Sequence, residues 1–125
     1  WDKSQEAYGW VMRFAGHDAA APIHASSNSG GSSSTPLGPA VTTSVPNTMI
    51  VRIAGFDDDD ITAGDPGLTG HTAITMGASG TGTGTASGDA GYVLQSTSGS
   101  SGASAFSLTG TEEYRAVTIA IAPAP

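Results

Sequence analysis

The sequence has no cysteine and very few basic residues. Without cysteine the folded chain cannot form disulfide bonds, so its stability must come from a packed core, bound ions or partner chains. Lysine and arginine together number 4, against 11 acidic residues, which gives a formal net charge of −7. This balance argues against binding of nucleic acid, whose phosphates need clustered cations, and against binding to anionic membrane surfaces. We therefore expect neither nucleic acid nor a membrane among its partners.

Long apolar runs and helix-forming residues are also scarce. No stretch approaches the roughly 20 apolar residues that span a bilayer, so membrane insertion is not expected. No signal peptide is visible, and the chain starts at Trp1, which indicates processing or a longer polypeptide. Charged residues make up only 12 %, whereas Ser, Thr and Gly are abundant. This composition predicts many short strands and Gly/Ser loops in a single domain over residues 1–125.

The stretch 45–71 carries the strongest pattern. Residues alternate from Thr48 to Phe56, which predicts a strand with Met49, Val51 and Ile53 on its apolar side. Four consecutive aspartates follow directly at the end of this strand. Core strands with oxygen-rich loops at their tips are typical of β-sandwiches.

Similar patterns predict further strands and an all-β fold. The expected strands cover residues 6–16, 40–44, 48–56, 71–76, 90–96, 103–109 and 113–122. We expect a β-sandwich or jelly roll of about seven strands, open to completion by strands from another chain or segment. The Ser/Gly-rich stretch 24–39 is expected to be a loop, with Ser26–Thr35 mobile or glycosylated, because it lacks apolar anchors.

The alternation also predicts the core. One apolar side of each strand is expected to be buried. This set is Trp10, Met12, Phe14, Met49, Val51, Ile53, Ile74, Val93, Phe106, Val117, Ile119 and Ile121.

The acidic run is the candidate metal site. Asp57, Asp58, Asp59, Asp60 and Asp65 lie within nine positions, and oxygen ligands at close spacing suit Ca²⁺. The run does not match an EF-hand loop, and the alternative is a solvated acidic turn that keeps a sheet edge soluble. Calcium is the only cofactor that we expect.

Other groups of residues give weaker evidence of a function. No nucleophile elbow is present, and Glu112 and Glu113 cannot flank one glycosidic bond, because neighbouring residues of a strand point to opposite faces. We therefore expect no enzyme. The aromatic residues Trp1, Tyr8, Trp10, Tyr92 and Tyr114 are candidates for a sugar-stacking platform, with core packing as the favoured alternative for Trp10.

Several segments together resemble a recurrent bacterial module of exported and cell-surface proteins, a lectin-like β-sandwich. They read GWVMRFAGHDAAAPI, VTTSVPNTMIVRIAGFDDDDIT, GDAGYVLQ and YRAVTIAIAPAP, in this order, and cover essentially the whole chain. The turn Gly16–Ile23 and the stretch Thr42–Thr48 are the most specific parts. In such modules strands precede the one that matches Tyr8–Phe14, so the resemblance implies that this chain is the C-terminal part of a larger sandwich.

These observations predict a structural role. We expect an extracellular subunit that assembles with copies of itself into a surface fibre or filament through strand or edge contacts. The candidate strand donors are Trp1–Phe14 and Arg115–Ala122. The alternative is a carbohydrate-binding or adhesive module with a calcium-supported acidic loop and surface glycans as partners.

Overall fold

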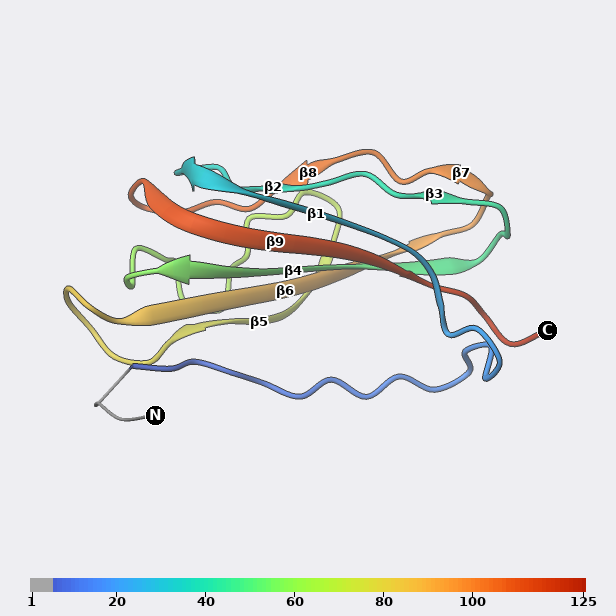
Figure 1. Ribbon diagram of the computed structural model, residues 1–125, viewed down its shortest axis with the longest axis horizontal. Coiled ribbons are helices and arrows are strands. Elements are labelled where there is room, and N and C mark those ends of the chain that lie inside the picture. Colours follow the sequence, from blue (N-terminus) through green and yellow to red (C-terminus); the bar gives the residue numbers. More distant parts are fainter. Residues whose placement is uncertain (1–5) are drawn as a thin grey trace.

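The computed structural model describes residues 6–125, and within them it contains nine strands and no helix (Figure 1). The strands are β1 (Ile23–Ser33), β2 (Leu37–Gly38), β3 (Thr42–Thr43), β4 (Thr48–Asp57), β5 (Thr72–Ala78), β6 (Ala86–Gln95), β7 (Gly99–Ser100), β8 (Ser104–Ala105) and β9 (Glu112–Ile121). The all-β class predicted from the sequence is therefore confirmed. The described residues include no helix that is long and apolar enough to cross a membrane.

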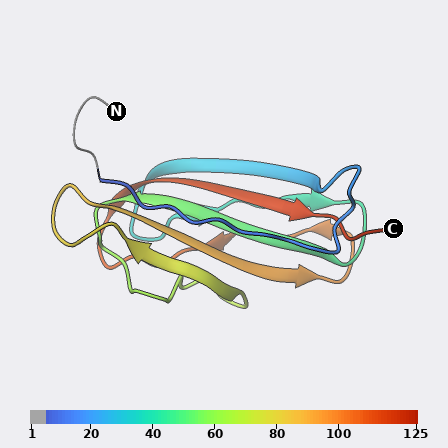
Figure 2. The same ribbon diagram turned by 90° about the horizontal axis from the view of Figure 1, so that it is seen from below.

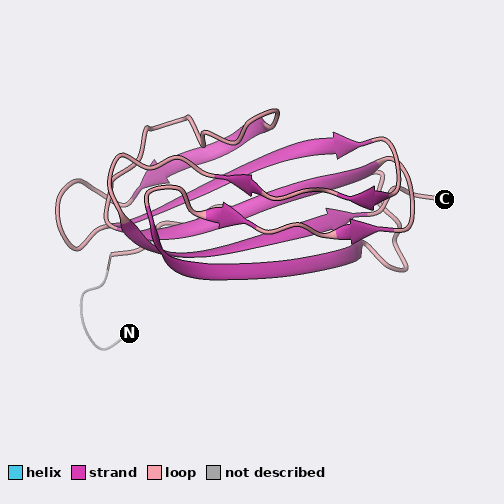
Figure 3. Cartoon of the chain, turned by 90° about the horizontal axis from the view of Figure 1, so that it is seen from above, coloured by secondary structure: helices cyan, strands magenta, loops and turns pink. Residues whose placement is uncertain are grey.

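Five strands form one antiparallel sheet in the order β1-β9-β4-β6-β5. A second layer consists of two short pairs, β2-β8 and β3-β7, which lie over one face of that sheet (Figure 3). This layered arrangement is consistent with a β-sandwich. We call the face toward the second layer the inner face and the opposite one the outer face.

The inner face holds the buried core. Its buried residues include Thr48, Ile50, Arg52, Ala54 and Phe56 of β4, Ala116, Thr118 and Ala120 of β9, and Val41, Phe106 and Leu108 of the second layer and its loops. The rings of Phe56 and Phe106 meet edge to face across the layers, with centroids 5.9 Å apart. Because the small residues of β9 lie opposite the second layer, the two layers can approach closely.

For most of the residues predicted to be buried, the prediction chose the wrong face of the sheet. Val51, Phe106 and Ile121 are buried as expected, but Ile74 is 38 % exposed and the other members are only half-buried. The prediction ranked the two sides of each strand by bulk. In the structure the side of β4 with Thr48, Arg52 and Ala54 is the one that the second layer covers.

Residues 6–15 form an extended arm instead of the predicted strand. The arm runs along the outer face of the sheet (Figure 2), and residues 6–15 contain no strand. The alternation expected for this segment is still visible, because Trp10 and Phe14 are half-buried whereas Val11 is 96 % exposed. The arm therefore packs by its side chains on top of the sheet and does not extend it.

The Ser/Gly-rich stretch expected to be a loop over 24–39 is another correction. Most of it forms β1, which pairs antiparallel with β9 from Ile23 to Ser33. Backbone hydrogen bonds along β9 supply the order that apolar side chains do not. The tract Ser26–Thr35, predicted to be mobile or glycosylated, therefore begins within a regular strand.

Strand β9 lies in the middle of the sheet and pairs with β1 on one side and with β4 on the other. Within this chain, Arg115–Ile121 of the proposed donor segment Arg115–Ala122 already have backbone partners on both sides. Donation of this segment to another copy stays a prediction. The edges of the sheet are β1 and β5. The edge at β5 is partly covered, because the Gly64 amide donates to the Met76 carbonyl over 3.0 Å.

The inner core should dominate stability. We expect Phe106→Ala to lower the free energy of unfolding by about 3–5 kcal/mol, because a buried ring is replaced by a cavity beside Phe56. Urea denaturation followed by tyrosine and tryptophan fluorescence measures this loss. The control is Leu94→Ala, whose side chain is 66 % exposed and should change stability by less than about 1 kcal/mol. Equal losses in both variants would contradict the assignment of the inner core.

Candidate functional site

A row of glycines crosses the sheet. Strand register places Gly30, Arg115, Gly55, Gly88 and Gly77 side by side, one from each of β1, β9, β4, β6 and β5. Paired residues of neighbouring antiparallel strands point to the same face. The row therefore leaves a band of the outer face with a single side chain, that of Arg115.

Two glycines of this row are sockets for the aromatic residues of the arm. A methyl group on Gly88 would lie 2.6 Å from Cζ3 of Trp10, and one on Gly77 would lie 2.7 Å from the Tyr8 hydroxyl. The two rings are 5.5 Å apart, and the Tyr8 hydroxyl is hydrogen-bonded to Oγ1 of Thr75 over 2.8 Å. Because glycine has no side chain, the rings can lie directly on the sheet backbone, and these contacts hold the arm on the sheet.

Gly30 accommodates Arg115 in the same way. A methyl group on Gly30 would lie 2.8 Å from Cδ of Arg115, so the arginine side chain lies over the edge strand. Its Nη1 donates to the carbonyl of Tyr114 over 2.8 Å, and its Nη2 donates to Glu113 over 3.1 Å. Both charged side chains are well exposed, at 72 % and 66 %. An exposed ion pair contributes little to stability, so these groups remain available for a ligand.

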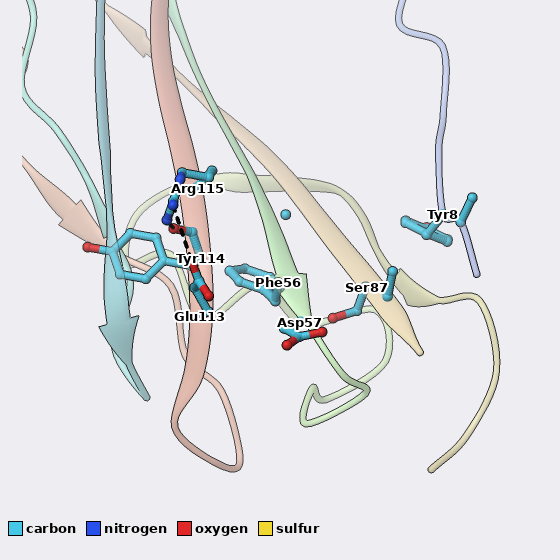
Figure 4. A pocket seen from close by; sticks show the side chains of 10 residues that line it. Tyr8, Phe56, Asp57, Ser87, Glu113, Tyr114 and Arg115 are labelled. Atoms are coloured by element: carbon cyan, nitrogen blue, oxygen red, sulfur yellow. Dashed lines mark hydrogen bonds and ion pairs between the residues drawn. The ribbon is translucent and has the colours of Figure 1, made fainter. Parts of the chain in front are cut away.

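Gly55 differs from the other three glycines. A methyl group there would meet only the carbonyl of Ser87, at 3.9 Å, and the residue is exposed in the middle of the row. Two shallow hollows adjoin it, of about 550 and 430 Å³, and both are lined by Tyr8, Gly55 and Arg115. Figure 4 shows the first hollow, with Tyr8 of the arm on one side and Glu113 and Arg115 of β9 on the other. We call this surface the Gly55 trough.

The predicted metal residues lie at the end of β4, where most of them bind neighbouring loops. Asp58 Oδ1 accepts hydrogen bonds from the Asp59 amide over 2.9 Å and from the Thr85 hydroxyl over 3.2 Å. These bonds, the one from the Asp59 amide first, hold the pKa of Asp58 below its ordinary value. Asp59 Oδ1 in turn accepts from the Gly82 amide over 3.2 Å. The first aspartates thus fasten the loop 79–85 to the end of β4.

Asp60 and Asp65 accept hydrogen bonds from other segments. Asp60 Oδ1 accepts from the Thr109 hydroxyl over 3.3 Å, and Asp65 Oδ1 accepts from the Gly67 amide over 2.9 Å within its own turn. Asp57 is exposed and lines the Gly55 trough. The four carboxylates that accept hydrogen bonds therefore have different partners, and that of Asp57 is exposed.

Glu112 joins this acidic region, although sequence reasoning did not include it. Desolvation first, and then the nearby Asp60, Asp58 and Asp57, raise its pKa above the ordinary value. The juxtaposition depends on β9 beginning beside the acidic loop, which no local pattern reveals. Within residues 6–125 no three acidic or histidine side chains are arranged as a metal-ligand set. Calcium binding by Asp57–Asp60 and Asp65 stays a prediction, tested by the change in melting temperature on titration with calcium.

A buried polar group lies on the inner face around Arg52. Its side chain is 1 % exposed, and its Nη2 donates to the carbonyl of Gly102 over 2.5 Å. Nη1 contacts Nε2 of His71, whose Nδ1 lies 2.8 Å from the carbonyl of Thr69. Burial first, and then the charge of Arg52, lower the pKa of His71. A neutral His71 can donate a hydrogen bond from Nδ1 to the Thr69 carbonyl and accept one from Arg52 at Nε2. It is therefore a hydrogen-bond partner of the buried guanidinium group.

Asp89 is the second buried ionisable residue. Its side chain is fully buried, and neither carboxylate oxygen has a hydrogen-bond partner among the described residues. It pairs in register with Ala54 and Met76, which belong to the apolar core. This burial raises the pKa of Asp89 to about 7, and the charge of Asp65 adds to the shift. The carboxyl group is therefore neutral in mildly acidic solution.

The trough, the arm and the acidic end of β4 are the candidate functional features of this chain. Searches with protein-family models, among curated proteins and among solved structures gave no significant match. Its function must consequently be argued from these features.

Asp89 predicts how stability changes with pH. Its pKa is raised in the folded state, so between pH 4 and 7 the folded chain retains a proton that the unfolded chain has released. The free energy of unfolding should fall across this interval and level off above pH 7, in total by on the order of 4 kcal/mol. Urea denaturation at several pH values measures this change.

The matched variants are Asp89→Asn and Glu113→Gln. The first should remove this part of the pH dependence, because an amide does not ionise. The second removes an exposed carboxylate and should retain it. An unchanged pH profile in Asp89→Asn would contradict the assignment.

Proposed function

We propose that this protein is a structural subunit at the cell surface or outside the cell, and that copies of it associate by exchanging the N-terminal arm. The observation that carries the proposal is the way in which the arm of residues 6–15 is attached. The proposed role is non-catalytic. Its location rests on the Ser-, Thr- and Gly-rich composition and on the resemblance to exported modules.

The arm is held by side chains alone. No backbone–backbone hydrogen bond within the described part of the chain involves residues 6–15. Its contacts include the aromatic sockets at Gly88 and Gly77 and the bond of Tyr8 to Thr75, and Phe14 is half-buried as well. Release of the arm therefore breaks few hydrogen bonds and exposes mainly the half-buried faces of its apolar side chains.

The base of the arm is fixed, and this gives the arm a hinge. The Gly16 carbonyl accepts from the Ala124 amide over 2.8 Å, and the Asp18 amide donates to the Ala122 carbonyl over 3.0 Å. Gly16 itself has a φ of 75°, a conformation that favours glycine. The sheet thus anchors the chain from residue 16 onward, while the preceding segment can lie on its own sheet or on that of a neighbour.

Exchange reproduces every socket contact in a second copy. Each molecule carries one arm and one set of sockets, so the same side-chain contacts form between molecules at sufficient concentration. Because the arm and its sockets are different surfaces, successive exchange gives an open chain or a closed ring. The edge strand β1 offers these copies an additional contact by strand pairing.

Trp10→Ala tests this proposal. It removes the ring that fills the Gly88 socket, so we expect at least a tenfold weaker association, which corresponds to about 1.4 kcal/mol. Light scattering coupled to size-exclusion chromatography over a range of concentrations measures association, and electron microscopy shows whether chains or rings form.

The control for this variant is Val11→Ala, in the same arm but with a side chain that is 96 % exposed. It should associate as the unaltered chain does, and circular dichroism should show that both variants are folded. A chain that stays monomeric at high concentration would contradict self-assembly. Undiminished association of Trp10→Ala would contradict exchange of the arm.

A further inference from the structure

We propose that the Gly55 trough binds an uncharged carbohydrate chain. This inference goes beyond self-assembly and rests on a separate observation, the open space above Gly55. The trough lies on the outer face between the arm and the side chain of Arg115.

The space above Gly55 is not filled by any described side chain. Glycine in the interior of a strand weakens it relative to alanine, and such glycines often mark a close approach of a ligand or another backbone. Gly88, Gly77 and Gly30 are explained by Trp10, Tyr8 and Arg115, which occupy the space above them. Gly55 has no positive φ and no described side chain above it. Among the described residues 6–125, no side chain fills this space, and we assign it to a ligand.

The walls of the trough have complementary chemistry. Tyr8 forms one wall, and its ring is held in place by the bond to Thr75 and by contact with Trp10. An aromatic ring that is fixed in this way offers an apolar surface to the C–H face of a sugar ring. The opposite wall carries Arg115 and Glu113, which together supply donors and acceptors for neighbouring hydroxyl groups.

The charges of the trough favour a neutral ligand. Arg115 is paired with Glu113, and Asp57 adds another carboxylate at the same hollow. An anionic ligand would meet two carboxylates beside a single guanidinium group, within a chain whose net charge is −7. Hydroxyl groups, which both donate and accept, suit this mixture of groups better.

The shape of the trough favours a chain over a small molecule. One hollow extends from Gly55 toward Asp57, and the other extends toward Ile53 and Val117. Both are open on the surface, whereas sites for small molecules usually enclose most of the ligand. Several sugar units could thus lie along the surface, with one of them over Gly55.

Gly55→Val is the decisive variant. Its side chain would occupy the floor of the trough, while the new Cβ meets only the Ser87 carbonyl at 3.9 Å. We expect the melting temperature to be unchanged or higher, because valine favours strands. Affinity electrophoresis of the full chain in gels that contain a linear glucan, a mannan or a galactan should show retardation of the unaltered protein by at least one of them. Gly55→Val should weaken this binding at least tenfold.

The control is Val11→Ala, which lies outside the trough and should bind as the unaltered chain does. Retention of binding in Gly55→Val, or no binding of the unaltered chain to any of the three polysaccharides, would overturn the proposal. Loss of self-association in Gly55→Val without polysaccharide binding would also overturn it and would assign the trough to a second copy. Failure of arm exchange appears separately, as unchanged association of Trp10→Ala.

Discussion

Strand β9 lies between β1 and β4, and its backbone hydrogen bonds to both strands determine which side chains share a face. The pairing of Ala54 with Ala116 and of Ile50 with Ala120 places small residues opposite the second layer. The same register aligns Gly55 with Arg115 on the outer face. A shift by one residue would send the core to the outer face and would break the row of glycines. The buried core and the Gly55 trough therefore depend on one set of backbone hydrogen bonds.

The inner face combines apolar packing with two buried ionisable groups. The cost of burying each group is reduced in a different way. Arg52 keeps bonds to Gly102 and His71, which compensate part of the cost of its burial. Asp89 has no described partner for its carboxylate and avoids the cost of a buried charge by remaining protonated as far as pH 7. The second layer thus closes over a core that becomes less stable as the pH rises.

The outer face is covered only in part, and both functional proposals arise from this. The arm covers β5 and β6 through the sockets at Gly77 and Gly88, which leaves the surface around Arg115 open. If the arm comes from a neighbouring copy, Tyr8 of that copy becomes one wall of the trough. Assembly and carbohydrate binding would then share a surface at the junction between copies, although each rests on its own observation.

The sequence by itself determined the strands that show a regular alternation of neighbouring residues. The alternation over Thr48–Phe56 and over residues 113–122 identified β4 and β9, because a pleated strand repeats every two residues. It also indicated correctly which side of the arm is partly covered, since Trp10 and Phe14 alternate with exposed residues. The scarcity of helix-forming residues was sufficient to predict an all-β fold.

Only the tertiary structure decided what depends on distant partners. Ser26–Ser33 forms a strand because β9 provides backbone hydrogen bonds, which its own side chains do not reveal. The segment 6–15 is an arm because its aromatic side chains pack on the outer face over Gly77 and Gly88, which lie on distant strands. Gly55 is one of many glycines in the sequence and acquires meaning only when the register places it between Arg115 and Gly88. Hydrogen bonds and contacts between residues far apart in sequence leave no periodic signal in either partner, so the buried face and the trough became visible only in the folded chain.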